Sequence, residues 1–151
     1  MKILFFLLSF MSGMSLATQV AINNKLRTFV GSPLLSSFFS FIVGSLGLAV
    51  AYLIAISLKL QPVPTLSDIS QTSSWMWLGG LFGSFYIFTT IVASPQIGFA
   101  NMFSLVVTGQ IILAVIIDHY GLLGSAIHEF NLVRGIGVLL LVVGLYIVQT
   151  H

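Results

Sequence analysis

Apolar residues in this chain are gathered into five long runs, which short polar segments separate. The runs cover about residues 3–23, 34–58, 75–93, 97–117 and 132–148. Each is close to the roughly 20 residues that a helix, rising about 1.5 Å per residue, needs to cross the apolar core of a bilayer. The pattern therefore predicts an all-α integral membrane protein, with five transmembrane helices in a single domain over residues 1–151.

The segments between the runs contain residues that end helices. Asn23, Asn24, Lys25 and Arg27 close the first run, and Ser94-Pro95-Gln96 closes the third. So short a connection predicts that the fourth helix returns antiparallel to the third. The first run also permits an alternative, a signal peptide cleaved after Ser15-Leu16-Ala17, but it continues to Ile22 and is longer than a typical signal core.

The composition is typical of a membrane-embedded chain rather than of a soluble domain. The sequence is 58% hydrophobic and 5% charged, with a mean hydropathy of +1.13, whereas a soluble domain carries about a quarter charged residues. The five basic residues are scattered and make no patch for nucleic acid. Cysteine is absent, which excludes disulfides, thiolate nucleophiles and cysteine-based metal sites.

Positive charge is divided almost evenly between the two sides of the predicted membrane domain. Lys2, Lys59 and Arg134 fall on one side, and Lys25 and Arg27 fall on the other. A split of three to two is nearly no bias, so the positive-inside rule cannot determine the orientation of the protein in the membrane. One interpretation is insertion in both orientations and an antiparallel homodimer, an inverted repeat of ten helices. The alternative is an orientation set by a partner or by the first helix.

Uncharged polar side chains recur within the spans, and in lipid they must face protein or a cavity. Two sets lie at helical spacing, each along one face: Ser12, Ser15, Gln19 and Asn23, and then Asn101, Ser104 and Thr108. Gln110 lies about 180° from Asn101 around an ideal helix, so the two amides cannot both line one cavity unless the helix is distorted, and one of the two is expected to bind solute. Both sets could line a solute path or join helices by interhelical hydrogen bonds.

Small and aromatic residues indicate where helices pack and where the membrane ends. The pairs Gly79 with Gly83 and Gly80 with Ser84 have the spacing that lets helix backbones approach closely. Trp75 is typical of the aromatic belt at a membrane surface. Trp77 lies deeper and is the better candidate to stack on a ligand.

Asp, Glu, Lys, Arg and His are missing from the middle of every predicted span, so the sequence offers no obvious proton relay. Asp118 and Arg134 lie at span ends on one side, where they could pair, act as a gate or simply face water. His119, His128 and Glu129 match no standard set of metal ligands. Catalytic motifs are absent as well. We therefore expect no metal, no cofactor and no enzymatic activity.

Five fragments in order along the chain resemble the YdcZ-like family, a five-helix branch of the drug/metabolite transporter superfamily. They are GMSLATQVAINNKL, WMWLGGLFGSFYI, SPQIGFANMFSLVVTGQ, DHYG and RGIGVLLLVVG. The resemblance covers nearly the whole chain. It implies a bundle similar to half of a ten-helix transporter, working in the bacterial inner membrane as a homodimer or with a paired homologue.

The resemblance also implies which positions matter: Gln19, Asn23, Trp77, Gly80, Gly83, Tyr86, Gly98, Gly109, Gln110 and Asp118. One departure concerns the related small multidrug resistance exporters, which use a glutamate in the first helix for proton coupling. No glutamate stands in the first run here, so drug–proton antiport is not expected.

These observations predict a transporter of a small polar or amphipathic solute, working by alternating access and surrounded by the lipid bilayer. The expected substrate-binding residues are Gln19, Asn23, Trp77, Tyr86, Asn101 and Gln110, and the expected packing residues are Gly79, Gly80, Gly83, Gly98 and Gly109. A hypothesis from another class is a membrane scaffold or regulatory subunit that transports nothing.

Overall fold

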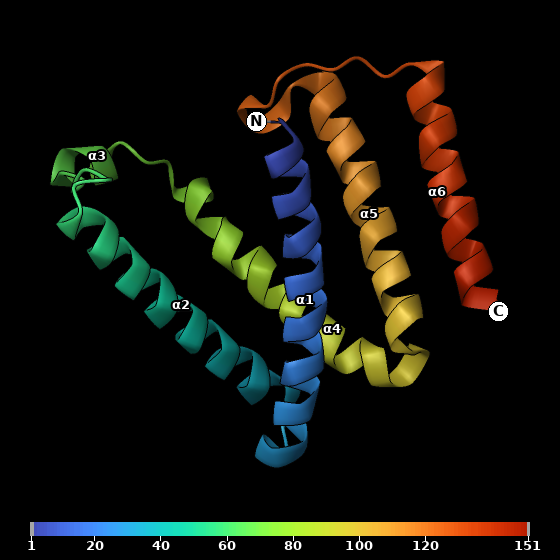
Figure 1. The fold of residues 1–151 in the computed structure, drawn as a ribbon, viewed down its shortest axis with the longest axis horizontal. Helices are drawn as coiled ribbons and strands as arrows, with labels where there is room; N and C mark the ends of the chain where they lie inside the picture. The colour runs from blue at the N-terminus through green and yellow to red at the C-terminus, as the bar shows by residue number, and fades with distance from the viewer. Residues whose placement is uncertain (1, 151) are drawn as a thin grey trace. The chain divides into compact units, whose positions relative to one another are not determined.

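The computed structural model describes residues 2–150, and within this range all regular structure is helical. Five helices are long and apolar enough to cross a membrane, which confirms that prediction. They are α1 (Lys2–Val30), α2 (Pro33–Ser57), η1 (Ser74–Leu78) continuing into α4 (Gly79–Ile97), α5 (Phe99–Tyr120) and α6 (Leu132–Thr150), with the short α3 (Leu66–Ser70) and η2 (Leu122–Gly124) in loops (Figure 1).

Two helices continue through residues that were expected to end them. Helix α1 reaches Val30 because its polar residues find partners: the Asn24 amide, for example, donates to the Val20 carbonyl at 3.0 Å. Helix α4 continues through Pro95 to Ile97, and the chain turns instead at Gly98, whose φ is +85°. A side-chain hydrogen bond thus accompanies the longer α1, whereas the backbone conformation of Gly98 ends α4.

The described chain forms two compact units, residues 2–92 and 93–150. In the first, α1 and α2 form a helical hairpin joined by Gly31 and Ser32. The φ of Gly31 is +72°, and the Ser32 hydroxyl caps α2 by accepting from the Leu35 amide at 3.3 Å. Pro33 follows at the first helical position, where its missing N–H costs nothing.

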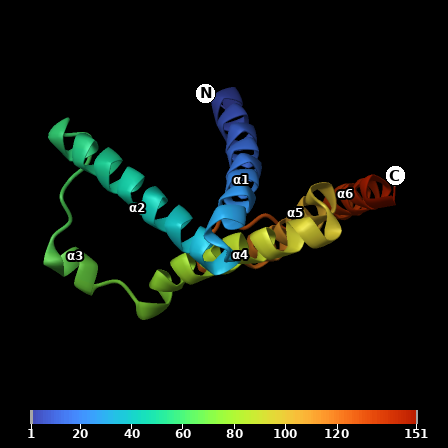
Figure 2. The same ribbon diagram turned by 90° about the horizontal axis from the view of Figure 1, so that it is seen from below.

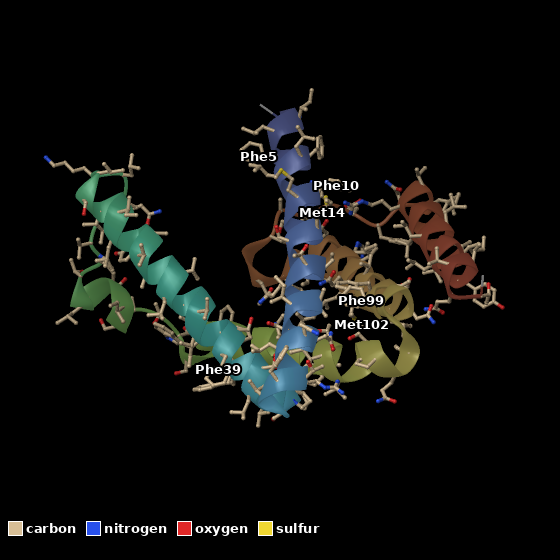
Figure 3. The ribbon with its side chains drawn as sticks, turned by 60° about the horizontal axis from the view of Figure 1, so that its bottom comes forward. Phe5, Phe10, Met14, Phe39, Phe99 and Met102 are labelled. Atoms are coloured by element: carbon tan, nitrogen blue, oxygen red, sulfur yellow. The ribbon has the colours of Figure 1, made fainter. Side chains whose placement is uncertain are left out.

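The two helices of this hairpin meet at the turn and diverge away from it (Figures 1 and 2). Buried residues on α1 and α2 are confined to the turn end: Val20, Asn23, Ser36 and Ser37. Away from the turn the helices are covered in exposed apolar side chains, and Phe5 and Phe10 on α1 are 64% and 70% exposed (Figure 3). In a membrane such surfaces face lipid or a partner helix.

Helix α4 approaches both helices of the hairpin. A Cβ built on Gly83 would lie 3.4 Å from the Phe41 ring of α2, and the Arg27 guanidinium of α1 donates to the Ile91 carbonyl at 2.8 Å. Ile87, Thr90 and Ile91 on this helix are all buried. The first unit is therefore a three-helix assembly held together near the α1–α2 turn.

In the second unit, α5 and α6 run antiparallel and pack side by side. Helix α5 ends at Gly121, which is left-handed with φ +60° and donates its N–H to the Ile117 carbonyl. The loop then folds back over this helix end: Ser125 Oγ also donates to the Ile117 carbonyl, at 3.1 Å, and the His128 amide donates to the Asp118 carbonyl at 2.9 Å. The carbonyls at the end of α5 are thus satisfied by the loop.

The loop before η1 contains a capping box that gives a pH prediction. The Thr65 amide and hydroxyl both donate to Asp68 Oδ2 at 2.8 Å, and these bonds hold the pKa of this exposed carboxyl below its ordinary value. Because the folded pKa is lowered, the stabilisation is present above the ordinary pKa of about 3.9 and is lost as the pH falls. Thr65→Val should raise the Asp68 pKa in an NMR titration; an unchanged titration would contradict this.

Candidate functional site

An apolar groove lies between α1 and α2 in the first unit. Its volume is about 610 Å³, within the range of about 300–1,000 Å³ typical of small-molecule sites. Its apolar walls include Met11 and Met14 on α1 and Phe39 and Val43 on α2. Met14 and Phe39 are labelled in Figure 3 on the two helices.

Three polar side chains meet at one place in this groove. Gln19 Nε2 and Asn23 Nδ2 on α1 both donate to the Ser40 hydroxyl on α2, each at 3.1 Å. Ser36 Oγ of α2 also donates to the backbone carbonyl of Asn23 at 2.7 Å, in a buried position. Asn23 is therefore fixed through both its side chain and its backbone, whereas Gln19 is held only at its tip.

This triad of Gln19, Asn23 and Ser40 leaves hydrogen-bond acceptors for a solute. Each amide donates one N–H to the Ser40 hydroxyl, so its carbonyl oxygen is not used in that bond. Neither the Gln19 nor the Asn23 amide oxygen accepts a hydrogen bond from a protein donor among the described residues, and both can accept one from a solute. The residues that line the groove include no ionisable side chain. The groove thus combines apolar walls with a neutral, acceptor-bearing polar patch.

The other predicted substrate-binding residues lie on η1, α4 and α5. Trp77 is 66% exposed and donates its indole N–H to Thr72 Oγ1 at 3.1 Å, an arrangement typical of the membrane surface. The Tyr86 hydroxyl on α4 is buried and has no hydrogen-bond partner in the described part of the chain. Asn101 and the exposed Gln110 both lie on α5, in the second unit. Within the first unit, the structure brings Gln19 and Asn23 together.

The predicted packing glycines have little around them within residues 2–150. A Cβ built on Gly79, Gly80 or Gly109 would meet nothing within 4 Å, and one on Gly83 would meet only Phe41. Gly98 is a turn residue with nothing nearby. Close packing of another helix against these positions stays a prediction.

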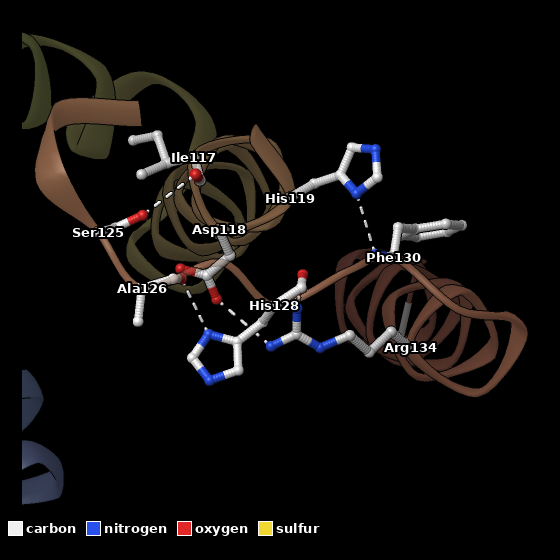
Figure 4. Close-up of polar contacts among 8 residues, drawn as sticks. All are labelled: Ile117, Asp118, His119, Ser125, Ala126, His128, Phe130 and Arg134. Carbon is white, nitrogen blue, oxygen red and sulfur yellow. Dashed lines mark hydrogen bonds and ion pairs between the residues drawn. The ribbon is translucent and has the colours of Figure 1, made fainter. Parts of the chain in front are cut away.

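A second polar cluster lies where α5 meets its loop (Figure 4). Arg134 Nη2 is 3.3 Å from Asp118 Oδ2, and Arg134 Nη1 donates to the His128 carbonyl at 2.9 Å. The Phe130 amide donates to His119 Nδ1 at 3.0 Å. No group of three or more His, Asp or Glu side chains in the described range could hold a metal ion. The structure brings Asp118 and Arg134 together, while a gate stays a prediction.

The Asp118–Arg134 pair leads to a prediction of a small effect. Both side chains are more than a third exposed, so solvent screens their attraction. Asp118→Asn should therefore lower the free energy of unfolding by about 1 kcal/mol or less, since exposed pairs contribute little. The measurement is equilibrium unfolding in mixed micelles. A gate would instead show itself as a solute leak through Asp118→Asn in proteoliposomes at unchanged stability.

A comparison with protein-family models decides the family. The model described as "Putative inner membrane exporter, YdcZ" matches residues 4–147, which is nearly the whole chain. The chain belongs to the YdcZ family. Together with the five apolar helices, this makes it a multi-pass protein of the inner membrane and is consistent with a membrane transporter. Searches of curated proteins and of solved structures gave no match.

Sequence reasoning missed Ser40 as the partner of Gln19 and Asn23. Ser36, Ser40 and Gly44 are small residues spaced four apart in the second apolar run. This spacing indicates helix packing but not the hydrogen bonds that Ser40 accepts. The pairing depends on how α1 and α2 rotate about their axes, and helical periodicity within one span cannot determine that. A hydroxyl across a tight hairpin from two amides is the signal that could have found it.

Proposed function

We propose that this YdcZ-family protein is an exporter, not an enzyme, and that it carries a small uncharged amphipathic solute by alternating access. The observation that carries the proposal is the triad of Gln19, Asn23 and Ser40 within an otherwise apolar groove of about 610 Å³. Apolar walls would hold the body of the solute, and the two amide oxygens would accept hydrogen bonds from its hydroxyl or amide donors.

Charge supports an uncharged solute over an ionic one. An ion in an apolar groove needs a partner of opposite sign, because the cost of moving an unpaired charge out of water is large. The groove lining offers none. A neutral solute with one polar end needs only the hydrogen bonds that the triad provides.

The test is a solute panel in proteoliposomes that contain the purified protein. Three fluorescent amphipaths of similar size are compared: one uncharged with a hydroxyl donor, one quaternary ammonium and one carboxylate. Protein-dependent flux of the uncharged compound alone is expected. Flux of the ammonium compound alone would contradict the assignment of substrate class, and flux of none would favour the scaffold hypothesis.

We include in the proposal an antiparallel homodimer in which two copies insert in opposite orientations and complete a ten-helix bundle. Its support is the near-even division of positive charge and the apolar helix faces that stay exposed in one copy. The open space beside Gly79 and Gly80 leaves room for a partner helix.

Dual insertion can be tested because the natural chain has no cysteine. Gln96→Cys at the end of α4 and Ala126→Cys in the α5–α6 loop are both exposed and are predicted to lie on opposite sides of the membrane. In intact cells an impermeant maleimide should label about half of each variant, as equal populations of two orientations require. Complete labelling of one variant and none of the other would exclude the homodimer of inverted copies.

A further inference from the structure

Helix α4 contains a proline whose effect on hydrogen bonding can be located at one atom. Pro95 lies inside the helix and has no N–H, so it cannot donate to the carbonyl four residues earlier, that of Ile91. Ile91 is fully buried. A buried carbonyl without a donor is costly, above all in a membrane, where water cannot replace the missing bond.

The side chain that meets this carbonyl comes from α1. Arg27 Nη1 donates to the Ile91 carbonyl oxygen at 2.8 Å, in a partly buried position. The only ion pair between side chains of residues 2–150 is that of Asp118 with Arg134, so Arg27 has no carboxylate partner there. Its guanidinium is committed to a backbone carbonyl, and that carbonyl is the one that Pro95 leaves without its helical donor.

We propose that Arg27 is a positioning residue that holds α4 on α1 by supplying the hydrogen bond that Pro95 removes. Asn23, one helical turn before it, binds Ser36 and Ser40 of α2. One short stretch of α1 therefore fixes α2 through Asn23 and α4 through Arg27. Asn23 also lines the groove, and Arg27 follows it by one helical turn. Loss of the bond to α4 is therefore expected to disturb the end of α1 that bears the solute site; this consequence for transport rests on the proposed function.

The test is a double-mutant cycle between Arg27 and Pro95, read as the unfolding temperature of the purified protein. Arg27→Ala should lower it by about 5 °C, as loss of a hydrogen bond from a charged donor to a buried acceptor does in a chain of this size. Pro95→Ala restores an N–H that can donate to the Ile91 carbonyl. In that background Arg27→Ala should cost less than about half as much.

Lys25→Ala is the matched control. Lys25 lies two residues away on the predicted same side of the membrane, is exposed, and places its ammonium over the Phe29 ring, 5.4 Å from the centroid. Like Arg27→Ala, the Lys25→Ala variant removes one positive charge from this side of the membrane, but it leaves the bond between Arg27 and the Ile91 carbonyl in place. It should therefore leave the unfolding temperature nearly unchanged. An equal loss in Lys25→Ala and Arg27→Ala, or an equal cost of Arg27→Ala in both backgrounds, would overturn the proposal.

Transport gives a second measurement that can be separated from the first. In proteoliposomes, Arg27→Ala should slow export of the uncharged amphipath several-fold. Adding Pro95→Ala should not restore export, because the N–H that this substitution supplies satisfies the Ile91 carbonyl within α4 and does not tie α4 to α1. Normal export by Arg27→Ala, with thermal coupling present, would overturn the positioning role. If the natural chain exports none of the three probes, the exporter proposal fails, while the thermal cycle still decides whether Arg27 holds α4.

Discussion

Asn23→Leu is expected to reduce solute export by about ten- to a hundredfold, since an unpaired or missing hydrogen bond at a buried site costs about 1–3 kcal/mol. The substitution keeps the branched shape and the number of heavy atoms in the side chain but removes its bond to Ser40 and its free amide oxygen. The measurement is the initial rate of export of the uncharged amphipath from proteoliposomes at matched protein density.

Two further variants separate binding from folding. Gln19→Leu changes the less buried amide of the triad and should reduce export while leaving the unfolding temperature close to that of the natural protein. Thr28→Val removes a hydroxyl from the same helix that bonds only to the Lys25 carbonyl, so export should be unchanged. Normal export by both Asn23→Leu and Gln19→Leu would remove the triad from the transport path.

Gly98→Ala is expected to lower the free energy of unfolding by about 1–3 kcal/mol, the usual cost of forcing a side chain into backbone geometry that only glycine adopts readily. Gly98 has φ +85° and ψ 152° and is the single residue between α4 and α5. The strain arises from the backbone, because a Cβ built there has nothing within 4 Å in the described structure. Equilibrium unfolding in mixed micelles measures it.

Gly109→Ala is the control for this substitution. Gly109 lies within α5, and a Cβ built there also meets nothing within 4 Å among residues 2–150. Alanine is a better helix former than glycine by about 1 kcal/mol, so this variant should be as stable as the natural protein or slightly more stable. If the two variants were equally stable, Gly98 would not be a strained turn in the folded protein.

Much of the fold could be predicted from the sequence, because the bilayer requires about 20 apolar residues for each helix and the chain repeats that length five times. The positions of the helix ends were predicted less accurately. Asn24 was expected to help end α1, but in lipid a polar side chain can instead bond back to its own helix, as its bond to the Val20 carbonyl shows. Pro95 was expected to end α4, yet the helix continues two residues beyond it.

The candidate site could be predicted only in part. Gln19 and Asn23 were expected to share a face of α1 because four residues separate them, and the structure places both in the groove. Their partner Ser40 and the bond from Arg27 to Ile91 depend on contacts between helices. The first contact depends on how α1 and α2 rotate about their axes, and the second depends on the Ile91 carbonyl, which Pro95 leaves without its helical donor. The periodicity of residues within one span reports neither.

The central claim is that the solute binds in the groove between α1 and α2, and solute protection of a cysteine tests it most directly. Met14→Cys lines the groove, and Phe5→Cys lies on the same helix outside it; both positions are about 60% exposed. Each variant reacts with a membrane-permeant maleimide, with and without the uncharged amphipath. The account predicts that the solute slows the reaction of Met14→Cys and leaves that of Phe5→Cys unchanged. Equal rates with and without solute at Met14→Cys, in a protein that exports the compound, would contradict it.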